Sequence, residues 1–93
     1  MDTIDCSAIP THITDFAFDH ITDLFEVTVD YDAQTVEIAE EDSDQARQKL
    51  TELCLEKIRD MRDEINRGYA LELSENEVVQ AEREVLGSGI KIQ

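Results

Sequence analysis

Residues 43–67 read SDQARQKLTELCLEKIRDMRDEINR, and this stretch decides the fold. Apolar side chains recur in it every three or four residues, which is the spacing of a buried helical stripe. Gly68 follows and is a suitable stop, because glycine readily adopts the conformation that ends many helices. At about 1.5 Å per residue the helix would be about 37 Å long, which is enough for one end to project or to pair with a second copy. The stripe consists of Ala46, Leu50, Leu53, Cys54, Ile58, Met61 and Ile65.

The segment before this helix has a different period. Apolar and polar side chains alternate over residues 25–31, and the alternation resumes at residues 35–39 after a short polar turn. A period of two is typical of a strand with one buried face. The sequence therefore predicts an antiparallel hairpin whose outward face carries Glu26, Asp30 and Glu37.

A second helical pattern precedes the hairpin. It begins at Pro10 or Thr11 and is predicted to end at about Asp23 or Leu24, because apolar residues recur there with helical spacing. Its predicted buried side chains are Ile13, Phe16, Ala17, Ile21, Leu24 and Phe25.

The C-terminal part predicts a short third helix. Ser74 and Glu77 have the spacing of a capping box, in which each side chain bonds to the backbone of the other residue. Residues 1–8 are expected to be irregular, and residues 90–92 to add a brief strand beside the hairpin. The predicted fold is a single acidic α+β domain over residues 1–93, with the order α-β-β-α-α and a short last strand. The third helix is predicted to bury Val78, Val79, Val85, Leu86 and, in part, Ala81.

The charge is distributed unevenly along the chain. The formal net charge is −15, from 23 acidic and eight basic residues. Residues 1–46 hold 13 of the acids and no Lys or Arg, whereas residues 47–93 hold ten acids and all eight bases. Such a field repels phosphate groups, which argues against direct binding to nucleic acid or to an anionic membrane. It favours a basic protein partner.

Catalytic and cofactor motifs are not evident. His12 and His20 lie eight residues apart, over two helical turns, and could share a metal only with help from Thr11, Asp15 or Asp19. Tight metal sites seldom have this arrangement, so no metal site or cofactor is predicted. Cys6 and Cys54 are expected to be reduced and structural, since the chain has no export signal and no apolar run near the ~20 residues that span a bilayer. We therefore expect a cytoplasmic protein that is not an enzyme and has no catalytic residues.

Acidic residues in the first predicted helix are spaced for binding. Asp15, Asp19 and Asp23 recur every fourth residue, so they rise by about 6 Å per step, which is similar to the distance between neighbouring phosphates of a nucleic-acid strand. Like charges at this spacing destabilise a helix by about 0.2–0.5 kcal/mol per pair, and no basic residue lies nearby to offset that cost. The predicted partner-binding residues are Asp15, Asp19, Asp23, Glu26, Asp30, Glu37, Glu40, Glu41, Asp42 and Asp44.

The leading hypothesis is an acidic inhibitor that mimics nucleic acid and binds a basic, nucleic-acid-binding protein. Small phage-encoded inhibitors of host defence, such as anti-CRISPR or anti-restriction proteins, have this size and composition. One alternative is an antitoxin or immunity protein that neutralises a basic toxin. Another is an assembly protein that forms a homodimer through the long helix and uses its acidity only for solubility.

Overall fold

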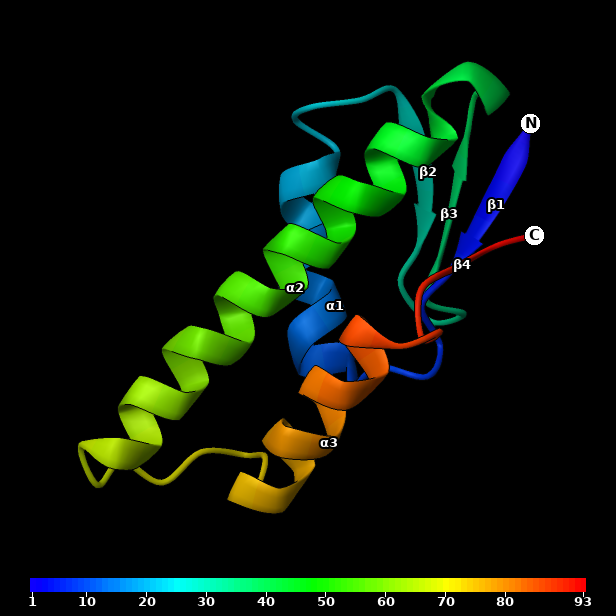
Figure 1. Ribbon diagram of the computed structural model, residues 1–93. Coiled ribbons are helices and arrows are strands. Elements are labelled where there is room, and N and C mark those ends of the chain that lie inside the picture. The colour runs from blue at the N-terminus through cyan, green and yellow to red at the C-terminus, as the bar shows by residue number, and fades with distance from the viewer.

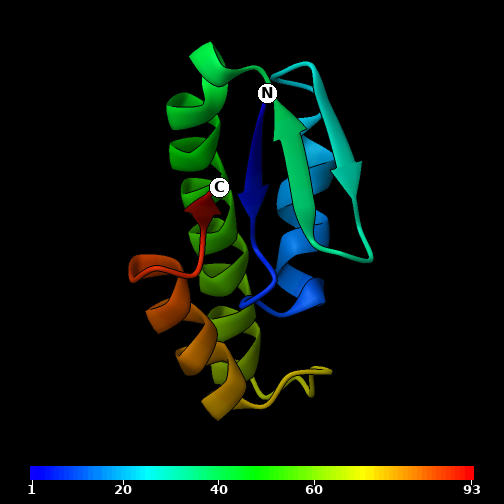
Figure 2. The ribbon, with the colours of Figure 1, turned by 90° about the vertical axis from the view of Figure 1, so that its right-hand side faces the viewer.

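A four-stranded antiparallel sheet forms one layer of the structure, and three helices form the other (Figure 1). The computed structural model describes all residues 1–93. The predicted α+β class is confirmed, and Figure 2 looks onto the face of the sheet that no helix covers. The elements are β1 (Asp2–Asp5), α1 (Thr11–Ile21), β2 (Val27–Asp30), β3 (Thr35–Ile38), the 3₁₀ turn η1 (Glu40–Asp42), α2 (Ser43–Asn66), α3 (Glu75–Leu86) and β4 (Lys91–Ile92).

The N-terminal segment was predicted incorrectly. Residues 2–5 form β1, which lies between β3 and β4 in the strand order β2-β3-β1-β4. The short last strand exists, but it pairs with β1, through Ile4 opposite Ile92, and not with the hairpin. Both errors have the same cause, because β1 is four residues long and its pairing partners are distant in the sequence.

The predicted hairpin is confirmed. Strands β2 and β3 pair with Thr28 opposite Glu37 and Val29 opposite Val36. Apolar side chains of both strands face the helices, and Glu26, Asp30 and Glu37 are exposed as predicted. The strands are shorter than the alternating segments at residues 25–31 and 35–39.

Helix α2 confirms the main prediction. All members of its apolar stripe are buried except Ile65, which is half-buried. The helix ends as predicted, because Gly68 has a φ of +89°, a value that favours glycine. The backbone N–H of Tyr69 donates to Glu64 O, and that of Gly68 donates to Ile65 O, both at 3.0 Å, which satisfies carbonyls at the helix end.

Helix α1 is shorter than predicted. It ends at Ile21, because the backbone N–H groups of Asp23 and Leu24 donate to carbonyls three residues back, a tighter 3₁₀ pattern. The predicted apolar stripe also needs correction: Leu24 is 53% exposed, and Phe18, outside that stripe, is the largest fully buried side chain. A chain that turns sharply into β2 leaves Leu24 on the outside.

Helix α3 begins at the predicted capping box. Ser74 Oγ accepts from the Glu77 N–H, and Glu77 Oε1 accepts from the Ser74 N–H, both at 3.2 Å. Leu86 was predicted to be buried and is 67% exposed, because it is the last residue of the helix and lies on its outer side. No helix in the structure is both long and apolar enough to cross a membrane.

Candidate functional site: an acidic surface

The ten predicted partner-binding residues lie on several parts of the surface. Nine of them are exposed and Asp42 is half-buried. The structure separates them into a group on and after α1, a group at one end of the hairpin, a group on the open sheet face, and two residues apart from these, Glu40 on η1 and Asp44 on α2.

The α1 group is anchored by a tyrosine. Asp15 and Asp19 are one turn apart on the exposed side of α1, but Asp23 lies beyond the helix end, so the three do not share one helix face as predicted. The hydroxyl of Tyr31 donates to Asp19 Oδ1 at 2.6 Å, and this bond raises the pKa of the tyrosine. The Tyr31 ring also packs edge-on against Phe18, with centroids 5.9 Å apart. Asp19 is therefore held next to the end of β2.

A second group gathers where the hairpin meets η1. Glu26, Glu41 and Asp42 line one shallow hollow of about 420 Å³, together with residues of β2 and the N-terminal Met1. These acids come from segments about 15 residues apart that the hairpin brings together. Asp42 occupies the N-cap position of α2, yet its side chain accepts no capping hydrogen bond. Its carboxylate is thus available to the surface.

The open sheet face carries the third group. Neighbouring strands place Thr28, Glu37 and Thr3 in one row, and Asp30, Thr35 and Asp5 in the next. Lys91 opposes Asp5 on β4 and adds a positive charge at the far border of the sheet.

Asp5 is an acidic residue that sequence reasoning missed. Its Oδ1 accepts from the Ser7 backbone N–H at 2.8 Å, and its Oδ2 accepts from Gln93 Nε2 at 3.0 Å. The first of these bonds is the main reason that its pKa is lowered. The alternation of residues 2–6 was the available signal, but residues 1–8 were expected to be irregular.

Asp44 does not join the other predicted residues. It lies in the first turn of α2 and lines a separate hollow with Arg47, Thr51 and Gly87, on the side of the helix that faces the end of α3. The guanidinium of Arg47 in the same hollow makes the surroundings of Asp44 less negative. The charge pattern along the sequence could not reveal this, since it does not specify the direction of a side chain around the helix.

The carboxylates of the first half form no ion pairs. The three side-chain ion pairs join His12 to Glu72, Lys49 to Glu52 at 3.6 Å, and Arg62 to Glu82 at 2.9 Å. Every carboxylate in these pairs belongs to residues 47–93. None of the 13 carboxylates of residues 1–46 is therefore in direct contact with a basic side chain.

Relatives offer no further guide. No family model matches this chain, and neither a curated protein nor a solved structure matches it significantly. The distribution of charge and the shape of the surface are the features that point to a function.

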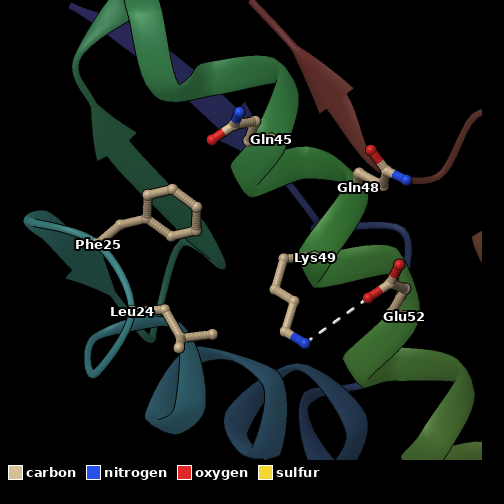
Figure 3. A pocket seen from close by; sticks show the side chains of 6 residues that line it. All are labelled: Leu24, Phe25, Gln45, Gln48, Lys49 and Glu52. Atoms are coloured by element: carbon tan, nitrogen blue, oxygen red, sulfur yellow. Dashed lines mark ion pairs between the residues drawn. The ribbon is translucent and has the colours of Figure 1, made fainter.

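The structure also contains a groove beside α2, and it contains no cluster of metal-binding side chains. A groove of about 350 Å³ separates the segment after α1 from α2 (Figure 3), with Leu24 and Phe25 on one side and the paired Lys49 and Glu52 on the other. No group of three or more His, Cys, Asp or Glu side chains is arranged to hold a metal ion.

The two cysteines are unreactive in this structure. Cys6 and Cys54 are both buried and free. Burial raises the pKa of each thiol to about 12. The thiolate is the nucleophilic form, so both side chains are protonated and inert at neutral pH.

Proposed function

We propose that this protein is a non-enzymatic inhibitor that binds a basic, nucleic-acid-binding protein in place of its nucleic acid. A phage-encoded inhibitor of host defence, of the anti-CRISPR or anti-restriction kind, fits this description. The observation that supports the proposal is the set of exposed carboxylates in residues 1–46, none of which forms an ion pair.

The physical basis is electrostatic complementarity. A protein that binds nucleic acid presents Lys and Arg side chains at positions where they can contact the phosphates. Asp15 and Asp19 on α1, and Asp30 and Glu37 on the open sheet face, would offer carboxylates to those side chains. Opposite fields also speed the encounter of the two proteins and disfavour acidic partners.

Two triple variants that have the same net charge as each other test the proposal. The first replaces Asp15, Asp19 and Asp23 by Asn. The control replaces Glu56, Asp60 and Glu64 of α2, which are also exposed and also four residues apart, by the corresponding amides. Each variant loses three negative charges, but the control acids share their part of the chain with Arg59, Arg62 and Arg67.

The measurement is affinity capture from a nuclease-treated bacterial lysate at low and high salt, with duplex DNA as competitor. We expect the native protein to retain nucleic-acid-binding proteins that DNA displaces, and the α1 variant to lose them while the control keeps them. Binding should weaken steeply with salt, because exposed charges are screened over about 10 Å at 0.1 M. Equal losses in both variants, or capture indifferent to DNA and salt, would refute mimicry by this surface.

The antitoxin or immunity alternative would use the same acidic surface, so the identity of the captured protein distinguishes it: a basic toxin, typically a nuclease, replaces the defence protein. The assembly alternative has one observation in its favour. Leu86 is exposed and lines a hollow with Leu55 between α2 and α3. It is weaker, because two copies of a chain with a charge of −15 repel each other.

A further inference from the structure

The border of the sheet at β2 has no partner. In the strand order β2-β3-β1-β4, β2 pairs with β3 alone, and its other side forms the right-hand border of the sheet in Figure 2. An edge strand exposes a row of main-chain N–H and C=O groups that can pair with another chain. The question is which groups of β2 these are.

Alternation of the backbone identifies the direction of each group in β3. The Gln93 N–H donates to Thr3 O at 2.8 Å, so the main chain of Thr3 points toward β4, and that of Ile4, the next residue of β1, points toward β3. Ile4 lies opposite Val36, whose main chain therefore points toward β1. Successive residues of a strand direct their main-chain groups to opposite sides. Thr35 and Glu37 therefore direct theirs toward β2.

The same rule identifies the free groups of β2. Asp30 and Thr28 lie opposite Thr35 and Glu37 in the register, so their N–H and C=O groups bond to β3. The main-chain groups of Val27 and Val29 consequently point away from the sheet. No backbone hydrogen bond from a turn, loop or cap reaches either residue, so two N–H donors and two C=O acceptors are open.

The two flanks of this edge differ in chemistry. On the side toward the helices, Val27 and Val29 are only half-buried, whereas Ile38 and Val36 opposite them in β3 are buried. On the opposite side, Glu26 immediately before β2 and Asp30 at its end are exposed carboxylates. A strand added here would cover the valines with its inward side chains and face the acids with its outward ones.

We propose that the β2 edge is the docking site for an extended segment of the partner in which apolar residues alternate with Lys or Arg. This rests on the proposed function and specifies how the basic partner is held: main-chain bonds to Val27 and Val29 supply affinity, and alternate side chains supply specificity. The charge complementarity with Glu26 and Asp30 selects a basic segment.

A second copy of this chain is a poor occupant of the edge. Antiparallel pairing of two β2 strands centred on Thr28 would place Glu26 of each copy opposite Asp30 of the other. Centring it on Val29 would place Glu26 opposite Asp32. Like charges directly opposite in a sheet are destabilising, so the acids disfavour self-pairing in these two registers while admitting a basic strand.

The test uses a synthetic ten-residue peptide that alternates valine with lysine or arginine, and a control peptide of the same composition in scrambled order. Binding is measured by calorimetry, and hydrogen exchange of the Val27 and Val29 amides is followed by NMR.

Two variants of the protein locate the binding edge. Val29→Pro removes an N–H that points outward, which an edge strand tolerates. Ile92→Pro is the matched control, because Gln93 N–H donates to Thr3 O on β1 and Ile92 therefore points outward from the opposite edge. Spectra of both variants establish that they are folded.

We expect the alternating peptide to bind about tenfold more tightly than the scrambled one, because only the alternating order places all its valines over Val27 and Val29 and all its cations toward Glu26 and Asp30. It should also slow exchange at both valine amides. Val29→Pro should weaken it about tenfold, and Ile92→Pro should leave it unchanged. Equal binding of the two peptides without slowed exchange would overturn the docking edge and leave charge mimicry standing. Failure of mimicry itself is read separately, from equal losses of lysate proteins in the two triple variants.

Discussion

At the scale of single residues, Asp5 links ionisation to folding. Its carboxylate accepts from the Ser7 N–H and from Gln93 Nε2, and the Ser7 bond above all lowers its pKa below the ordinary 3.8. A pKa that is lower in the folded state stabilises the fold whenever the group is ionised. This contribution is present above about pH 3.8 and is lost as the pH falls through the folded-state pKa.

We predict that Asp5→Asn lowers the free energy of unfolding at pH 7 by less than about 1 kcal/mol, since the carboxylate lies at the surface where water screens it. The difference from the native protein should disappear as the pH is lowered below 3.8. Urea unfolding at several pH values measures both effects. Asp32→Asn is the control, because the Asp32 side chain is exposed and, unlike Asp5, is not hydrogen-bonded to Ser7 or Gln93. A difference that persists unchanged at low pH would contradict the assignment.

At the scale of elements, α3 depends on its first turn. The helix has only 12 residues, a length at which an isolated helix is marginal in water. It is held by the capping box at Ser74 and by contact with α2, where Arg62 Nη1 lies 2.9 Å from Glu82 Oε1. The cap matters because it satisfies an N–H that has no partner within the helix.

We predict that Ser74→Ala lowers the free energy of unfolding by about 1 kcal/mol, the usual cost of losing a serine cap. Urea unfolding followed by circular dichroism measures this loss. Ser88→Ala is the control, because Ser88 is an exposed serine in the turn after α3. If both substitutions have the same effect, the capping box does not stabilise the helix.

At the scale of the whole molecule, charge opposes compactness. A net charge of −15 is carried by a chain whose radius of gyration is 13.1 Å, and the first half contains no basic residue to offset its acids. Folding brings these carboxylates closer together than they are in the unfolded chain, so their repulsion destabilises the folded state. Salt weakens this repulsion, because the screening length falls from about 30 Å at 0.01 M to about 10 Å at 0.1 M.

We therefore predict that the melting temperature rises between these salt concentrations. The rise should be smaller in the Asp15, Asp19 and Asp23 triple variant than in the Glu56, Asp60 and Glu64 variant, whose substituted acids have basic neighbours in α2. Calorimetry of the three proteins measures the difference. A melting temperature that falls with salt would mean that attractive pairs outweigh the repulsion.

The sequence by itself determined the helices, the hairpin and the charged half of the chain. Each of these depends on residues close together in the sequence: the apolar stripe of α2, the alternation of β2 and β3, and the capping box at Ser74. Local spacing decides which face of such an element is apolar. Net charge depends on composition alone, so the acidity of the first half follows directly from its residue types.

Only the tertiary structure decided which of these parts meet. Strand β1 pairs with residues 30 to 36 positions away in β3 and with the other end of the chain in β4, and no local pattern specifies such partners. The strand order leaves the Val27 and Val29 edge open. The hairpin brings Glu26 near Glu41 and Asp42, whereas Asp44 lies in a separate hollow beside the end of α3. Periodicity predicts the face of an element, but the neighbour of that face is chosen by how the complete set of apolar surfaces packs together.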